Sequence, residues 1–210
     1  MATSLLFDFD GTIADSFPLI VDLFYELTEQ QPIVDEQRIN RLRQLPFRKV
    51  VKELDVPFHR VPGLIVRGKS LMQRRIGEVK PFPQIEQVLR DLRADGHRLF
   101  ILSSNSEENI RKFLRKEKIE DYFEDVQGGA SLLAKAHAIK KIMHKNELDP
   151  KDCVYIGDEV RDITAAKKAG VRVVSVAWGF NDRKALAKHK PFALVYRPTE
   201  LIELFRKLTV

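Results

Sequence analysis

The sequence predicts an α/β fold with a Rossmann-like, three-layer α/β/α core on a parallel sheet, and a small all-helical cap inserted after the first strand. Short apolar runs alternate with longer stretches of helical periodicity. This order builds parallel strands joined by right-handed helical crossovers. The interval 15–80 breaks this alternation with a succession of helical patterns, which predicts a helical insertion.

Five apolar runs are expected to form the buried strands of the sheet. They lie at residues 4–7, 99–102, 154–156, 171–177 and 193–196. Ligands of such sheets bind beyond the carboxyl ends of the strands. The polar residues that follow each run are therefore the candidates for a functional site.

Helices are expected between the strands of the core. Residues 85–94 carry an apolar stripe and are followed by Asp95-Gly96, a helix-stop signal, and residues 162–169 likewise end at Gly170. These stretches supply the helical layers that cover the sheet.

The insertion contains three helical patterns and one proline-bearing turn. The helices are expected at residues 18–30, 35–54 and 64–76, and the turn at residues 56–63. The parallel-sheet pattern resumes after Pro81 and Pro83, which suit a stiff linker. We therefore expect a core formed by residues 1–14 and 81–210, and a cap formed by residues 15–80.

Composition and cysteine usage favour an intracellular globular protein. The 210 residues, 44% of them hydrophobic, suit one compact core with a modest insertion. The single cysteine, Cys153, lies in an expected strand, so we predict an inert core thiol and a reducing, cytoplasmic environment. No stretch approaches the roughly 20 apolar residues that span a bilayer, and no membrane association is expected.

The formal net charge of +6 is concentrated in one segment. Residues 38–80 hold twelve Lys or Arg and three Asp or Glu, a net +9, which leaves −3 for the rest of the chain. Phe47 and Phe58 are the only aromatic residues there, and core packing is expected of both. A nucleic-acid surface would interleave more aromatic residues with its basic ones, so nucleic acid is not an expected partner. An inactive module that docks an acidic partner remains an alternative.

The first chemical motif follows the first expected strand. Asp8 and Asp10, spaced by two, lie on the same side of an extended chain and could share a divalent ion. Gly11 permits a tight turn or a close backbone approach, and Thr12 can bond a neighbouring loop. By itself this motif could also be a solvated turn.

Three further fragments lie at or near other strand ends. Asp158 and Asp162 stand one helical turn apart after the run 154–156. Ser104-Asn105 follows the run 99–102, and Lys135 opens an expected helix. Taken singly, these are explained by a helix cap, a hydroxyl-bearing turn and a surface lysine.

Together, the four fragments closely resemble the haloacid dehalogenase-like hydrolase superfamily in order and chemistry. DFDGTIADS resembles its first motif, Ser104-Asn105 its second, Lys135 its third and GDEVRD its fourth. Residues 165–171 and 176–179 are similar to the phosphoglycolate phosphatase-like branch. The resemblance implies a magnesium-dependent phosphatase that acts on a small phosphorylated metabolite, similar to phosphoglycolate.

The resemblance also assigns catalytic roles. Asp8 would attack phosphorus and form an aspartyl-phosphate, and Asp10 would serve as general acid and then general base. Ser104 and Lys135 would hold the phosphoryl oxygens. Because the register of that strand end is uncertain by one residue, Ser103 remains an alternative to Ser104.

A metal site follows from the same resemblance. Mg²⁺ would be held by the Asp8 carboxylate, the backbone carbonyl of Asp10 and Asp158. Asp162 would steady either the metal site or Lys135.

Substrate contacts are expected from the core and from the cap. Gly11, Thr12 and Asn105 are assigned to substrate binding in the core. Arg48 and Lys49 are the cap residues expected to reach a group distal to the phosphate, because an arginine fork suits a carboxylate or a second phosphate. Exposed helix residues explain them equally well.

The superfamily includes reactions other than phosphatase chemistry. Asp10 argues against a dehalogenase and a phosphonoacetaldehyde hydrolase, which lack the second aspartate of the first motif. A phosphomutase would retain every core residue seen here, so it remains an alternative.

Overall fold

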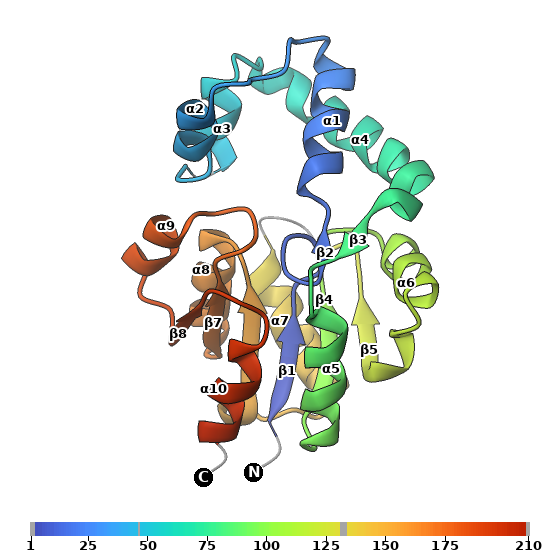
Figure 1. The fold of residues 1–210 in the computed structure, drawn as a ribbon, viewed down its shortest axis with the longest axis vertical. Helices are drawn as coiled ribbons and strands as arrows, with labels where there is room; N and C mark the ends of the chain where they lie inside the picture. The colour runs from blue at the N-terminus through green and yellow to red at the C-terminus, as the bar shows by residue number, and fades with distance from the viewer. Residues whose placement is uncertain (1–2, 46, 131–133, 209–210) are drawn as a thin grey trace.

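Six parallel strands form the sheet of the core. The computed structural model describes residues 3–45, 47–130 and 134–208, so the first two and last two residues of the expected core lie outside it. The strands are β1 (Ser4–Phe7), β4 (Arg98–Leu102), β5 (Phe123–Gln127), β6 (Cys153–Gly157), β7 (Arg172–Val176) and β8 (Ala193–Val195). They lie in the order β5-β4-β1-β6-β7-β8, with β1 in the interior (Figure 1).

Helices cover both faces of this sheet. Alternate residues of β1 show the two layers, because successive side chains of a strand point to opposite faces. Leu5 packs with α5 (Ile85–Ala94), α6 (Glu107–Lys116) and α10 (Glu200–Leu208). Leu6 packs with α7 (Lys135–Lys145), α8 (Val160–Ala169) and α9 (Arg183–Lys188). The structure thus confirms the predicted three-layer α/β/α class.

Four helices stand beyond the carboxyl ends of the strands (Figure 1). They are α1 (Phe17–Thr28), α2 (Glu36–Leu42), α3 (Phe47–Glu53) and α4 (Val61–Arg75). The chain enters and leaves this helical cap through two short antiparallel strands, β2 (Ala14–Asp15) and β3 (Lys80–Pro81). The division at residues 14/15 and 80/81 stays a prediction of where the two parts separate. Single 3-10 turns occur at Phe58–Arg60, Ile76–Glu78, Glu120–Tyr122 and Pro150–Asp152.

Two elements differ from the sequence prediction. The single helix expected over residues 35–54 is two short helices, α2 and α3, in keeping with Pro46 between them, since proline interrupts the helical hydrogen-bond ladder. The edge strand β5 is absent from the predicted set. Its Glu124 and Asp125 interrupt the apolar pattern; Glu124 pairs with Arg98 of the neighbouring strand β4, and Asp125 pairs with Lys145 of α7.

The expectation that Phe58 packs in a core is wrong. Its side chain is half exposed, and the guanidinium of Arg48 lies 5.1 Å from the ring centroid. The side chain of Phe47, the other aromatic residue of that prediction, lies outside the described residues.

Cys153 fits its predicted structural role. It is fully buried, and burial raises the pKa of its thiol to about 12, which keeps the reactive thiolate scarce. Among the described residues, no helix combines the length and the apolar character needed to cross a bilayer.

Candidate active site

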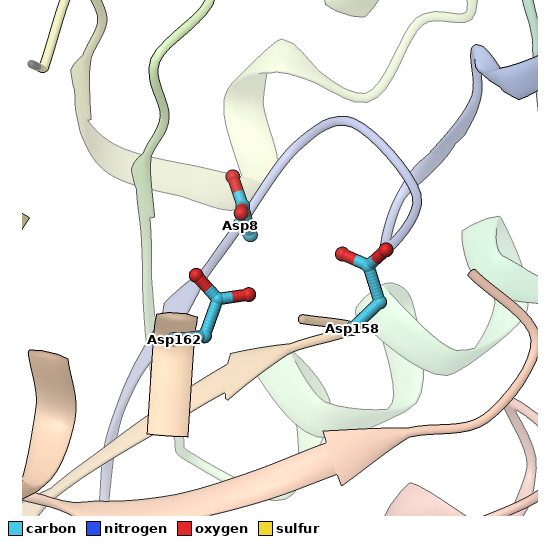
Figure 2. A group of neighbouring side chains, drawn as sticks. All are labelled: Asp8, Asp158 and Asp162. Carbon is cyan, nitrogen blue, oxygen red and sulfur yellow. The ribbon is translucent and has the colours of Figure 1, made fainter. Parts of the chain in front are cut away.

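Three carboxylates meet at the carboxyl edge of the sheet. Asp8 directly follows β1, Asp158 follows β6, and Asp162 lies in the first turn of α8. All three are buried, and one oxygen of each lies within 4.8 Å of the others. Figure 2 shows the three side chains directed toward a shared space. Parallel strands bring residues distant in sequence to the same edge, which explains this convergence.

Lys135 neutralises part of this acidic cluster. Its Nζ lies 2.5 Å from Oδ2 of Asp8 and 2.5 Å from Oδ1 of Asp162, and the side chain is buried. Burial alone would lower the pKa of Lys135, but Asp162 and Asp8 outweigh it and hold the pKa well above its usual value. The lysine is therefore a buried cation, whereas a solvated surface lysine was the simpler explanation of its sequence position.

Asp158 is fixed by groups from two loops. Its Oδ1 accepts a hydrogen bond from the Thr12 hydroxyl at 3.1 Å, and its Oδ2 accepts one from the Phe180 amide at 2.6 Å. Gly11 has a φ of 77°, and a Cβ atom there would lie 2.2 Å from Oδ2 of Asp158, so only glycine fits. Gly11 and Thr12, which the resemblance assigns to substrate binding, thus lie against Asp158.

Asp10 is held separately from the three carboxylates. The side-chain amide of Asn105 donates to its Oδ1 at 3.2 Å and to its Oδ2 at 3.1 Å. Burial raises the pKa of Asp10 to about 6, and the charge of Asp8 adds to the rise. A carboxyl group with this pKa can both donate and accept a proton near neutrality. Asn105, assigned to substrate binding, is a direct partner of Asp10.

The acidic cluster suits a small divalent cation. Burial raises the pKa of Asp158 well above its usual range and that of Asp162 to about 6, although Lys135 opposes the second rise. Three carboxylates thus face one buried lysine, and a further cation would favour their charged forms. Carboxylate oxygens are also the ligand type that Mg²⁺ prefers. The residues present fit such an ion, and Asp8 and Asp158 are the first candidates to hold it.

Asp162 is the least available of the three acids. Its Oδ1 pairs with Lys135, and its Oδ2 accepts the Glu159 amide at 3.1 Å. Of the two roles left open for Asp162, these contacts favour holding Lys135.

The two serines after β4 differ in their surroundings. Ser103 is fully buried, and its hydroxyl accepts the Asn105 amide at 3.2 Å. Ser104 is partly exposed beside this turn. The hydroxyl of Ser104 is therefore the more accessible one, which favours it as the phosphate-binding group.

Arg48 and Lys49 lie apart from the contacts that join cap and core. Both are exposed on α3, and Arg48 lies over the Phe58 ring within the cap. A contact of either residue with substrate stays a prediction. Arg43 does reach the core, and its guanidinium donates to the carbonyl oxygens of Gly179 and Phe180.

Sequence reasoning missed both Arg43 and Arg161. Arg161 pairs with Glu159 at 2.5 Å and is one of the charges that lower the pKa of Asp10. A basic residue between Asp158 and Asp162 was a visible signal for Arg161. No sequence feature marked Arg43 as a functional residue, because nothing distinguishes it from the other basic residues among the twelve in its segment.

Fold and site together define an α/β enzyme whose acidic centre lies at the carboxyl edge of a parallel sheet. The family model described as haloacid dehalogenase-like hydrolase matches residues 5–176. The chain belongs to that family, which confirms the resemblance seen in its motifs.

Individual relatives narrow the enzyme class. The chain is 34% identical to a phosphoglycolate phosphatase of Synechococcus elongatus over 217 residues, which covers 98% of each chain. It is 20% identical to a pyrophosphatase of Bacillus cereus over 98% of this chain and 97% of that protein. A solved haloacid dehalogenase-like hydrolase of Streptococcus pneumoniae shares the fold, with a TM-score of 0.83 and 22% identity over 97% of this chain and 98% of that chain. The protein is thus an enzyme of the phosphatase class.

Proposed function

We propose that the protein is a Mg²⁺-dependent phosphatase that hydrolyses a small phosphoglycolate-like metabolite through an aspartyl-phosphate on Asp8. One observation carries the proposal: a buried, fixed carboxylate at Asp8 lies in the same site as Asp10, whose pKa of about 6 suits proton transfer. The Asp8 carboxylate is held on one side by the Phe9 amide at 2.8 Å and on the other by Lys135.

The reaction divides into two displacements. In the first, an oxygen of Asp8 bonds to phosphorus, the ester bond to the leaving alkoxide breaks, and Asp10 gives its proton to that alkoxide. In the second, Asp10 takes a proton from water while the water oxygen bonds to phosphorus. The bond from phosphorus to Asp8 then breaks, which releases inorganic phosphate and restores both aspartates.

The other residues would bind and orient the phosphoryl group. The ammonium group of Lys135, which donates to Asp8 and Asp162, would place its positive charge beside the phosphoryl oxygens. Ser104 would donate to a second oxygen. Asp8, the Asp10 carbonyl and Asp158 would hold Mg²⁺, which would supply charge that offsets the repulsion between carboxylate and phosphate.

The substrate is proposed as a small phosphate ester because the phosphoglycolate phosphatase relative covers nearly the whole chain. Another relative with a similar sequence is named a pyrophosphatase. The substrate therefore has to be identified with a panel of phosphorylated compounds. The cytoplasm is the proposed location, since the lone cysteine is free and buried.

The test is phosphate release from a panel with and without Mg²⁺. The panel contains 2-phosphoglycolate, pyrophosphate, hexose phosphates and an aryl phosphate, compared by kcat/KM. We expect turnover only with Mg²⁺, and none from Asp8→Asn, which keeps the shape but not the nucleophile. Asp121→Asn, an exposed aspartate, is the matched control.

Three results would decide against the proposal. Near-normal kcat in Asp8→Asn would exclude the covalent route. Conversion of a hexose 1-phosphate to its isomer without phosphate release would instead establish the phosphomutase alternative. A complete lack of turnover with Mg²⁺ on every substrate would favour the binding module.

A further inference from the structure

Arg43 joins the cap to the loop that follows β7. From the end of α2, its Nη2 donates to the carbonyl of Gly179 at 2.6 Å, and its Nε donates to the carbonyl of Phe180 at 3.1 Å. Its own carbonyl accepts the side-chain amide of Asn181 at 2.8 Å and the backbone amide of Asp182 at 3.2 Å. Both the side chain and the backbone of this one cap residue are therefore bound to the core.

The same loop holds Asp158 from its other side. The Phe180 amide donates to Oδ2 of Asp158 at 2.6 Å, and the Asn181 amide donates to the carbonyl of Asp158 at 3.3 Å. A Cβ atom at Gly179 would lie 2.4 Å from Oδ2 of Asp158, so the loop backbone is in close contact with this carboxylate. Any movement of the loop would therefore displace these donors from Asp158.

Two consecutive peptide groups connect Arg43 to Asp158. The carbonyl of Gly179 and the amide of Phe180 belong to one planar peptide unit, whose oxygen faces Arg43 and whose N–H faces Asp158. The next unit repeats this arrangement. The Phe180 carbonyl accepts a hydrogen bond from Arg43, and the backbone amide of Asn181 donates one to the carbonyl of Asp158. Because a peptide unit is rigid, anchoring its oxygen also fixes the direction of its N–H. A cation at the oxygen also polarises the unit and strengthens its N–H as a donor.

The loop also contacts the cap through an aromatic side chain. The Phe17 ring, at the start of α1, packs edge-on against Phe180 with ring centroids 4.8 Å apart. In Figure 1, α2 and α3 stand over the connection between β7 and α9. Both Arg43 and Phe17 of the cap thus lie against the loop.

We propose that Arg43 is a positioning residue that couples closure of the cap to the metal-binding geometry of Asp158. The coupling rests on the proposed Mg²⁺ site. When the cap is closed, the two peptide groups hold Asp158 in one orientation, and when it opens they lose their anchor. Since coupling between two sites is reciprocal, bound Mg²⁺ must favour the closed cap by the same factor.

The first test measures Mg²⁺ affinity without turnover. Trp178, the only tryptophan in the chain, directly precedes Gly179 and donates its indole N–H to the Thr12 carbonyl at 3.1 Å. Its fluorescence therefore reports on the loop during a Mg²⁺ titration, with calorimetry as an independent readout. We expect Arg43→Ala to raise the Mg²⁺ dissociation constant roughly 5- to 50-fold, within the usual range of allosteric coupling.

Arg41→Ala is the matched control for this titration. Arg41 lies two residues away and pairs with Glu53 inside the cap at 2.9 Å. We therefore expect the Mg²⁺ dissociation constant of Arg41→Ala to stay within about twofold of that of wild type. Equal constants for Arg43→Ala and wild type, with both proteins folded by circular dichroism, would overturn the coupling. The phosphatase proposal would survive that result.

The second test uses the unaltered protein, so it can test the proposed coupling even if Arg43→Ala fails to fold. The Asp182 amide donates to the Arg43 carbonyl, and its hydrogen exchange therefore reports on the contact between cap and loop. Saturating Mg²⁺ should slow this exchange severalfold. Unchanged exchange in protein shown by calorimetry to bind Mg²⁺ would overturn the inference. If calorimetry detects no Mg²⁺ binding, the metal part of the proposed function fails, and the inference fails with it.

Discussion

The side-chain amide of Asn105 donates to both carboxylate oxygens of Asp10, at 3.2 and 3.1 Å. Burial raises the pKa of Asp10 to about 6, and the contacts with Asn105 lower it, since they favour the charged form. Asn105 therefore contributes to the pH range over which Asp10 remains a proton donor.

The first prediction concerns the pH dependence of kcat/KM. Protonated Asp10 is needed in the first displacement, so kcat/KM should fall about tenfold per pH unit above the pKa of Asp10. In Asn105→Ala the pKa rises, and this descending limb should move to a pH roughly one unit higher, the scale of one charge-assisted hydrogen bond. Asp10→Asn should lose the limb and roughly 10² to 10⁴ in rate. Superimposable profiles of wild type and Asn105→Ala would remove Asn105 from this role.

A second prediction concerns Thr12 and the metal requirement. Thr12→Val keeps the shape but removes the hydroxyl that bonds Oδ1 of Asp158, so the Mg²⁺ concentration for half-maximal activity should rise roughly tenfold. Asp158→Ala, which removes the proposed ligand, should raise it further. Thr164→Val is the control, because Thr164 is exposed and bonds only its own helix among the contacts described. A Thr12→Val titration that overlays that of Thr164→Val would contradict the prediction.

Third, Lys135→Met should make the metal-free protein sensitive to pH. The substitution leaves Asp8 and Asp162 in a buried site without their cation. When both are charged, this should lower the free energy of unfolding by about 3–5 kcal/mol. The pKa of Asp162, already raised to about 6 by burial, should rise further without Lys135.

A carboxyl group with a raised folded-state pKa binds a proton in the folded state that the unfolded state has released. Stability of the variant should therefore fall as pH rises from about 4 through the folded pKa. Urea unfolding at several pH values, with the exposed Lys140→Met as control, measures the effect. A stability gap from wild type that does not grow between pH 5 and pH 8 would argue against the buried ion pairs.

A fourth prediction tests Arg48 against substrates with and without a distal anion. If its guanidinium leaves the Phe58 ring to bind such a group, Arg48→Ala should lower kcat/KM for 2-phosphoglycolate about 10- to 150-fold. The rate with an aryl phosphate, which lacks that group, should hardly change. Equal losses on both substrates would indicate damage to the cap, and no loss would place Arg48 on the solvated surface.

The fold class and the position of the acidic centre could be predicted from the sequence alone. Apolar runs of strand length identify the strands of a parallel sheet, and residues at their carboxyl ends converge on one edge whatever their separation in sequence. Asp8, Asp158 and Asp162 could be brought together by this rule alone. The edge strand β5 was not predicted, because charged residues interrupt its apolar pattern.

Which side chain bonds which aspartate depends on the three-dimensional fold. Thr12 bonds Asp158 across 146 residues, Asn105 bonds Asp10 across 95, and Arg43 bonds Gly179 across 136. Such pairs depend on strand register, on the path of loop backbones and on the break between α2 and α3 that directs Arg43 toward the core. Local periodicity encodes burial and secondary structure, whereas hydrogen-bond partners follow from three-dimensional distances that no local pattern contains.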